Sequence, residues 1–211
     1  MNARKQSDRL TDVYSAGSPE SLARSYDGWA EGYESEMLAS GYRHPVVCVA
    51  LLARHLPAGA GPIVDAGAGT GLIGEWLRLL GYPSVCGFDL SAGMLAVARR
   101  KGAYEDLREA ALGGRLPYDD GRFAAAVCAG VFTLGHAGPE GLDDLLRIVR
   151  PGGRVVLTVK ERLYEQGFET HLSALAAAGR CRLLEMTPSY LSMPNQPDQS
   201  PSRALVLAVG S

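Results

Sequence analysis

From residue 44 onward, short apolar runs alternate along the chain with segments whose apolar residues recur at helical spacing. Such alternation is typical of β–α units that build a largely parallel sheet. The strands predicted in this way are residues 62–66, 84–90, 107–112, 122–130 and 153–159. The helices predicted to cover them are residues 44–56, 71–81, 91–102, 139–150 and 168–180. The pattern therefore predicts a doubly wound α/β fold.

The C-terminal part of the chain departs from this alternation. Two apolar runs, residues 181–187 and 203–209, are separated by a loop rich in Pro, Asn, Gln and Ser. No helix fits between them, so we expect them to pair antiparallel at or near a sheet edge. The whole is a seven-stranded, mostly parallel sheet with an antiparallel C-terminal strand.

Residues 1–43 lie before the alternation and contain an aromatic-rich helical segment at residues 26–38. We expect residues 1–43 to form a helical arm that covers a core of residues 44–211. A length of 211 residues fits one domain with a substantial core.

Composition and charge narrow the classes of partner. Hydrophobic residues make up 46% and charged residues 21% of the chain, and the formal net charge is −2. Such a balance gives no electrostatic reason to expect nucleic acid or an anionic membrane as partner. The four cysteines lie far apart without a CxxC pair, and no Asp, Glu and His set suggests a metal site. The polar start and the lack of a long apolar run predict a cytoplasmic protein.

Residues 65–71 read D-A-G-A-G-T-G at the carboxyl end of the first predicted strand. Ligands bind at that edge of an open parallel sheet. Glycines let the backbone turn sharply and approach a ligand, and the helix that follows offers free amides. A bare strand-to-helix turn requires one or two glycines rather than three alternating ones. We therefore expect Gly67 and Gly69 to border a ligand.

Asp89 stands at the end of the second predicted strand, about 20 residues further on, where a carboxylate can accept from both hydroxyls of a ribose. The alternative is a helix-capping aspartate. A nicotinamide dinucleotide competes as ligand, but its G-x-G-x-x-G fingerprint requires glycine where this chain has Leu72. A carboxylate ahead of the loop would also repel a pyrophosphate.

The D-x-G-x-G-x-G spacing resembles motif I of the class I S-adenosylmethionine-dependent methyltransferases. The resemblance extends over residues 87–99, 114–130 and 145–159, which are similar to the family's second strand, fourth strand and fifth strand with their flanking segments. Residues 26–37 and 130–136 resemble the group typified by the Williams–Beuren-region methyltransferase-like protein. The resemblance implies a Rossmann-like fold, S-adenosylmethionine as cofactor and S-adenosylhomocysteine as product.

The resemblance also implies roles for single residues. Asp65 orders the loop, the glycines admit the methionine portion, Asp89 holds the ribose, and Leu90 and Met94 flank the adenine. An aromatic stripe on the N-terminal helix closes over the cofactor, although its Trp29 could equally pack on the sheet. The family often has an acid where this chain has Ala111, so backbone contact from residues 111–112 has to substitute. The residues assigned to the cofactor are Tyr26, Trp29, Tyr33, Asp65, Gly67, Gly69, Asp89, Leu90, Met94, Ala111, Leu112 and Ala129.

Methyl transfer from a sulfonium is an in-line displacement, and holding the reactants in line can supply about 7 to 11 kcal/mol. His136 is the preferred base because it follows the fourth strand and titrates near neutrality, although an isolated histidine is as often structural. Thr133 is expected to orient the acceptor. The residues expected at the pocket or its mouth are Lys160, Glu161, Tyr164 and Tyr190, of which the first three could instead begin a solvated helix. His44 and His55 are expected to lie far from the ligand.

A lid built from the N-terminal arm and residues 189–202 leaves room for a small-molecule acceptor rather than nucleic acid. The chain lacks the DPPY-like or NPPY-like segment that this superfamily associates with methylation of amino groups, so the resemblance slightly favours transfer to oxygen over nitrogen or sulfur. Two other classes stay open at this point. One is a non-catalytic binding module with the same fold, suggested by Ala111 and Ala124. The other is a nicotinamide oxidoreductase. The sequence does not indicate an oligomeric state.

Overall fold

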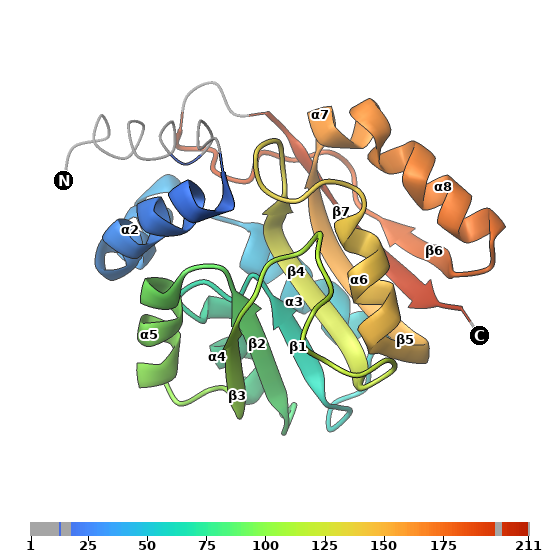
Figure 1. The fold of residues 1–211 in the computed structure, drawn as a ribbon, viewed down its shortest axis with the longest axis horizontal. Coiled ribbons are helices and arrows are strands. Elements are labelled where there is room, and N and C mark those ends of the chain that lie inside the picture. The colour runs from blue at the N-terminus through green and yellow to red at the C-terminus, as the bar shows by residue number, and fades with distance from the viewer. Residues whose placement is uncertain (1–12, 14–17, 197–199, 211) are drawn as a thin grey trace.

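The computed structural model describes residues 13, 18–196 and 200–210. Its seven strands form one sheet in the order β3-β2-β1-β4-β5-β7-β6, with helices on both faces (Figure 1). The strands are β1 (Ile63–Ala66), β2 (Val85–Asp89), β3 (Asp106–Glu109), β4 (Phe123–Phe132), β5 (Val149–Lys160), β6 (Cys181–Met186) and β7 (Ser202–Val209). The helices are α2 (Pro19–Ser40), α3 (His44–His55), α4 (Leu72–Leu79), α5 (Ala92–Arg100), α6 (Gly141–Ile148), α7 (Glu161–Leu163), the π-helix η1 (Tyr164–Phe168) and α8 (Glu169–Ala177).

The pairing of the strands agrees with the prediction from sequence. β3, β2, β1, β4 and β5 are parallel to one another, whereas β7 is antiparallel to both β5 and β6. The C-terminal runs pair antiparallel because the segment that joins β6 to β7 contains no crossover helix. The predicted seven-stranded, mostly parallel sheet is confirmed.

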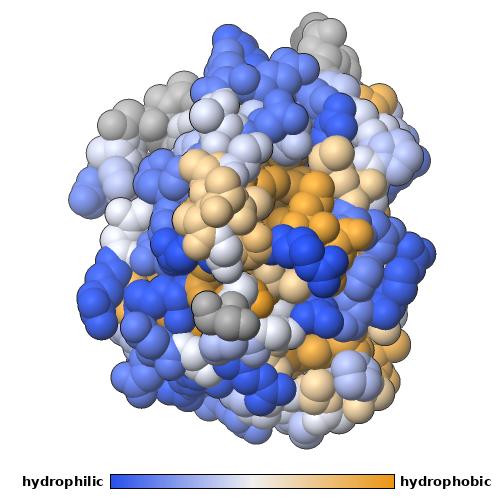
Figure 2. Space-filling view, turned by 90° about the vertical axis from the view of Figure 1, so that its right-hand side faces the viewer, coloured by the Kyte–Doolittle hydropathy of each residue, from blue (hydrophilic) through white to orange (hydrophobic). Residues whose placement is uncertain are grey.

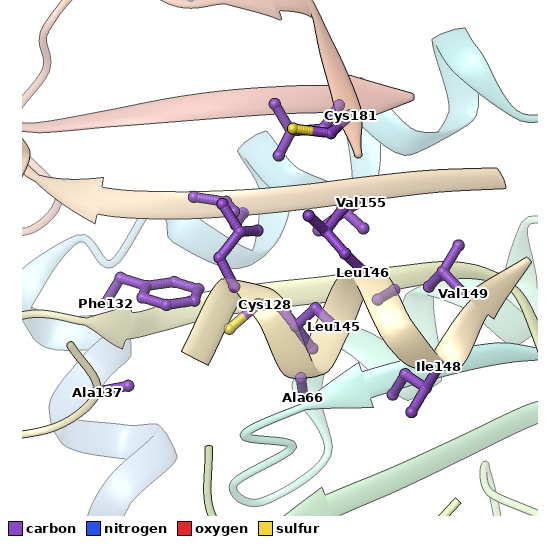
Figure 3. Close-up of a cluster of buried hydrophobic side chains, with 14 of the residues drawn as sticks. Ala66, Cys128, Phe132, Ala137, Leu145, Leu146, Ile148, Val149, Val155 and Cys181 are labelled. Carbon is purple, nitrogen blue, oxygen red and sulfur yellow. The ribbon is translucent and has the colours of Figure 1, made fainter. Parts of the chain in front are cut away.

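Both faces of the sheet are buried, so successive side chains of a strand enter different halves of the core. Ile63 packs with α3 and α4, and its neighbour Val64 packs with α6 and α8. Figure 1 shows α6 and α8 in front of the sheet and α3 behind it. In Figure 3 the α6 side chains Leu145 and Leu146 lie among strand side chains of the front half, including Cys128 and Val155. This packing holds the carboxyl ends of the strands in fixed positions.

The Pro-Gly-Gly segment does not separate helix from strand as the sequence predicted. β5 begins at Val149, directly after α6, and the segment forms an irregularity inside the strand. Phe123 pairs with Val149, but Ala125 pairs with Arg154. The chain therefore advances five residues in β5 while it advances two in β4. Gly153 is required there, because a Cβ would lie 2.7 Å from the carbonyl oxygen of Ala124. Such bulges bend a strand without ending it.

Two other element boundaries differ from the predictions. β3 ends at Glu109, three residues earlier than expected, because the chain beyond it turns to border a cavity. The N-terminal helix α2 begins at Pro19 rather than near residue 26. Ser18 caps it, accepting from the backbone N–H of Ser21 while the Ser21 side chain accepts from the backbone N–H of Ser18. This reciprocal cap satisfies two amides that a helix start leaves open.

The edge strand β6 exposes Leu183 and Met186 at 39% and 37% of their surfaces. Figure 2 views the molecule from that side and shows hydrophobic surface between hydrophilic residues. The charged Arg182 and Glu185 lie on the same strand, and charges on an edge oppose pairing with other chains. None of the helices in the described part of the chain is long and apolar enough for a membrane span.

Candidate functional site

A cavity of about 390 Å³ opens at the carboxyl ends of β1, β2, β3 and β4, beneath α2. This is the edge at which open parallel sheets bind ligands. The sequence-predicted residues that line it are Tyr26, Tyr33, Gly67, Gly69, Asp89, Leu90, Met94, Ala111, Leu112, Ala129 and His136. Asp65, Trp29 and Thr133 lie close by without lining it.

The glycine loop between β1 and α4 uses its glycines for different purposes. Gly67, Gly69 and Gly71 all have positive φ, at 76°, 52° and 88°. A Cβ on Gly67 would lie 2.3 Å from Cγ2 of Val131, so this residue permits close packing on β4. A Cβ on Gly69 would meet no atom within 4 Å. Gly69 therefore leaves space on the cavity side of the loop.

Asp89 ends β2 at the cavity wall. One carboxylate oxygen accepts from the backbone N–H of Gly69 at 2.9 Å, and the other accepts from that of Ser91 at 2.9 Å. Burial raises the pKa of this carboxyl, while the bonds from Ser91 and Gly69 act in the opposite direction. Each oxygen has a second lone pair that can accept from a ligand hydroxyl. The N-cap of α5 is Ser91, whose hydroxyl accepts from Met94 N–H.

Asp65 lies underneath the loop, fully buried. Its carboxylate accepts from the hydroxyl of Tyr104 at 2.6 Å, and that hydroxyl accepts from the backbone N–H of Gly74 at 3.0 Å. Burial raises the pKa of Asp65 to about 7. The Tyr104 ring occupies the space that a Cβ on Gly74 would need, at 2.3 Å. Asp65 thus fixes the start of α4 through Tyr104, a residue that the sequence analysis missed although Gly74 marked its contact.

The aromatic residues of α2 divide between two environments. Tyr26 and Tyr33 border the 390 Å³ cavity. Trp29 is only 2% exposed, lies against both rings and donates from its indole nitrogen to Glu36 at 2.9 Å. The indole therefore packs beneath the tyrosines, within a cluster of N-terminal residues and Met193 rather than on the sheet.

α2 is held over the cavity by a contact that the sequence did not reveal. Asp27 accepts from the Ser91 hydroxyl at 2.6 Å and from the backbone N–H of Gly93 at 2.8 Å. Gly93 permits this approach because a Cβ there would lie 2.9 Å from Cα of Asp27. Ion pairs of Arg100 with Glu31 and of Lys101 with Glu34 add to the contact between α5 and α2.

His136 reaches the cavity from the loop after β4. Its Nε2 lies 3.0 Å from the Tyr26 hydroxyl, which joins this loop to α2. Burial lowers the pKa of His136 to about 4, so the imidazole is neutral at neutral pH. Thr133 supports the loop, since its carbonyl oxygen accepts from the His136 N–H at 3.1 Å.

Comparison with known proteins identifies this arrangement. A family model described as a methyltransferase domain matches residues 64–157. Methyltransferase-like protein 27 of Homo sapiens is 34% identical over 164 residues, which is 73% of this chain and 65% of that protein. The chain belongs to the class I S-adenosylmethionine-dependent methyltransferases.

Further relatives of this methyltransferase are similar over shorter stretches or in fold alone. The demethylmenaquinone methyltransferase of Clavibacter sepedonicus is 35% identical over 126 residues, 57% of this chain and 51% of that protein. A chain of the Haloferax volcanii complex between the Trm112 methyltransferase activator and a methyltransferase superposes with a TM-score of 0.64 at 19% identity, covering 88% of this chain and 98% of that one. This methyltransferase spans about half to two thirds of the length of those curated relatives.

The cofactor of this family is S-adenosylmethionine. The residues at the cavity fit that molecule in chemistry and shape. Gly69 leaves open space beside the loop, the Asp89 carboxylate has lone pairs free to accept from hydroxyls, and Leu90 and Met94 add apolar surface to the cavity wall. Ala124 is 1% exposed within β4, so the departure from the family pattern there affects packing.

A second, smaller cavity of about 40 Å³ adjoins the first in this methyltransferase. Thr133, Trp29 and Lys160 line it, and so does His44, for which the sequence predicted no place near a cavity. His44 Nδ1 lies 2.8 Å from the Tyr190 hydroxyl, and burial lowers the pKa of His44 to about 3. The methyltransferase therefore has a polar annex that local sequence patterns did not indicate.

The remaining residues that the sequence placed at the pocket mouth lie elsewhere. Glu161 forms an ion pair with Arg203, and Tyr164 is buried in the front half of the core. Tyr190 contacts His44 without lining either cavity. His55 pairs with Glu185 at 2.7 Å on the side of β6. Within the described residues, no group of three or more His, Cys, Asp or Glu side chains could hold a metal ion.

Proposed function

We propose that the protein transfers the methyl group of S-adenosylmethionine to a small-molecule acceptor and releases S-adenosylhomocysteine. The observation that carries the proposal is the 390 Å³ cavity at which the glycine loop, the Asp89 carboxylate and the start of α5 meet beneath α2. When bound, the cofactor supplies an electrophilic methyl carbon. The chain itself has to position the acceptor against that carbon, which is the main requirement of an in-line displacement.

Each wall of the cavity has a separate part in this function. The Asp89 oxygens accept from the ribose hydroxyls while also holding the backbone of Gly69. Tyr26 and Tyr33 close the cavity from above and exclude water, because Asp27 fixes α2 on α5. Exclusion of water strengthens the polar interactions inside a site.

His136 and Thr133 serve the acceptor in this proposal. A neutral imidazole can accept a hydrogen bond or a proton from an acceptor hydroxyl, and Nε2 already faces the Tyr26 hydroxyl at 3.0 Å. A pKa of about 4 leaves little driving force for complete proton transfer at neutral pH. We therefore assign His136 to orienting the acceptor hydroxyl, with Thr133 as a second hydroxyl contact.

A small acceptor and transfer to oxygen complete the proposal. α2 lies over the larger cavity, and the segment at Ser192 and Met193 lines the smaller one, an arrangement that suits a small acceptor better than a polymer. The relatives named as demethylmenaquinone methyltransferases support a small acceptor by their names. The absence of an NPPY-like segment after β4 supports an oxygen acceptor. In reactions with S-adenosylmethionine labelled with ¹³C in its methyl group, the ¹³C chemical shift of the product distinguishes an O-methyl from a C-methyl group.

The test of the function is calorimetric titration with S-adenosylhomocysteine. Wild type is expected to bind at micromolar concentration, and Asp89→Ala to bind about 10- to 150-fold more weakly, because a hydrogen bond to a charged group contributes about 1.5 to 3 kcal/mol. Asp106→Ala is the matched control, since it removes a carboxylate of β3 that forms an ion pair with Arg108. No binding to wild type, or binding of NADH instead, would refute the proposal. Binding without turnover of any acceptor in a metabolite screen would leave the non-catalytic module.

A further inference from the structure

The smaller cavity lies where α2, the start of α3, the ends of β4 and β5 and the segment at Ser192 meet. It shares four lining residues with the cofactor cavity, namely Tyr26, Tyr33, Tyr42 and Gly130. A water molecule needs about 10 to 15 Å³ of such volume, so 40 Å³ accommodates about three water-sized groups. The annex therefore has room for one small polar group of a ligand whose body lies in the larger cavity.

The polar groups of the annex are mostly hydrogen-bond donors. The Lys160 ammonium donates to the Ser200 carbonyl oxygen at 2.9 Å and to the Ser192 hydroxyl at 3.3 Å. The Thr158 hydroxyl oxygen already accepts from the backbone N–H of Gly130 at 2.8 Å, so its own hydrogen is directed elsewhere. Thr133 adds another hydroxyl. No acidic side chain lines the annex among the residues that the structure describes.

Lys160 is partly buried, and an ammonium that loses hydration without gaining a counter-charge is energetically unfavourable. Burial accordingly lowers the pKa of Lys160 to about 8, although the amine stays mostly protonated at neutral pH. The residue that follows Lys160 in the sequence is acidic, but this Glu161 pairs with Arg203 instead. The neighbouring His44 adds no charge, because its pKa is lowered to about 3. An anion in the annex would supply the missing charge.

We propose that the annex binds an acidic oxygen group of the methyl acceptor, a carboxylate or an ionised hydroxyl, with Lys160 as its counter-charge. This inference rests on the proposed function and specifies its substrate class. The acidic group contacts Lys160, Thr158 and Thr133, and the rest of the acceptor extends past Tyr26 toward the cofactor cavity. Lys160 is a specificity-determining residue in this arrangement.

Trp29 provides a direct probe, because it lines the annex and the only other tryptophan, Trp76, is 51% exposed on α4. In a Trp76→Phe background saturated with S-adenosylhomocysteine, Trp29 fluorescence is titrated with acetate and benzoate. The neutral acetamide and benzamide serve as isosteric controls. We expect the carboxylates to bind at least tenfold more tightly than the amides.

Lys160→Met is expected to remove the preference for carboxylates, and Lys160→Arg is expected to retain it. Arg182→Met deletes one charge of the exposed strand β6 and is expected to leave the preference unchanged. Equal binding of carboxylates and amides to the Trp76→Phe protein, or a preference that survives Lys160→Met, overturns the inference. If Lys160→Met does not fold, the comparison of carboxylates with amides in the Trp76→Phe protein decides alone. Calorimetry with S-adenosylhomocysteine on each variant distinguishes failure of the proposed methyl transfer from failure of the acidic acceptor. If S-adenosylhomocysteine binds normally but carboxylates are not preferred over amides, only the acidic acceptor is refuted.

Discussion

At the scale of single residues, the glycines of the D-x-G-x-G-x-G loop differ in what their missing side chains permit. Gly67 has no room for a Cβ because Val131 lies 2.3 Å from its place, so packing adds to the requirement that its positive φ of 76° imposes. Gly69 has room, and its requirement comes from the positive φ of 52° and from the space on the cavity side. Only the open space at Gly69 concerns the cofactor directly.

Gly69→Ala is therefore expected to weaken binding of S-adenosylhomocysteine at least tenfold while costing about 1 to 2 kcal/mol of stability, the usual strain of a left-handed alanine. Gly59→Ala is the matched control, since Gly59 also has a positive φ, 82°, and open space around it, but lies between α3 and β1 away from the cavity. Calorimetry and urea unfolding measure the two quantities. Equal binding by the two variants would contradict a role of Gly69 in admitting the cofactor.

At the scale of elements, α2 is the lid and α5 is its support. The N-terminus of α5 has amides that lack partners within the helix. Ser91 satisfies one of them within α5, at Met94, and Asp27 of α2 accepts from another, at Gly93. A side chain of α2 thus caps α5, which makes the position of the lid part of the stability of α5.

Asp27→Ala is expected to lower the free energy of unfolding by about 0.5 to 2 kcal/mol, the usual loss for a helix cap. It should also weaken S-adenosylhomocysteine binding and speed amide hydrogen exchange in α2, because Tyr26 and Tyr33 lose their anchor. Glu31→Ala on the same helix removes only an exposed ion pair with Arg100 and should change stability by less than about 0.5 kcal/mol. Unchanged exchange in α2 of Asp27→Ala would show that other contacts hold the lid.

At the scale of the whole molecule, folding shifts the pKa of several ionisable groups in the direction that favours their neutral forms. Burial lowers the pKa of His44 to about 3 and that of His136 to about 4, and it raises that of Asp65 to about 7. The histidines lie on α3 and after β4, so their burial depends on the complete fold. A base whose pKa is lower in the folded state binds fewer protons there, and acidification below its unfolded pKa of about 6.5 favours unfolding.

His44→Gln isolates one of these groups. The stability of wild type relative to this variant should fall with decreasing pH between about 6.5 and 3, with a slope approaching 1.4 kcal/mol per pH unit, because the unfolded state takes up a proton that buried His44 does not. Contributions of Asp65 and His136 cancel in this difference. Urea unfolding from pH 4 to 8 measures it, and the flat region above pH 7 is the internal control. A constant difference down to pH 4 would show that His44 is protonated in the fold.

Much of the fold follows from local patterns. Alternating apolar runs predicted the strands, because burial on both faces of a parallel sheet requires continuous apolar segments. Ser91 was correctly predicted as a cap, since a cap acts within its own first turn. The end of β3 and the irregularity at Pro-Gly-Gly were not predicted, because both depend on which strand lies alongside.

The features of the candidate site likewise divide into those that local sequence patterns predicted and those that only the folded structure revealed. The sequence alone was sufficient to locate the glycine loop and Asp89, since β-α order places the carboxyl ends of parallel strands at one edge. The folded chain was needed to reveal the Tyr104 contact to Asp65, the Asp27 cap on α5 and the annex with Lys160 and His44. These contacts join residues up to 146 positions apart, as His44 and Tyr190 are. Hydrophobic periodicity records which side of an element is buried, whereas the partner across a cavity is set by the packing of distant elements.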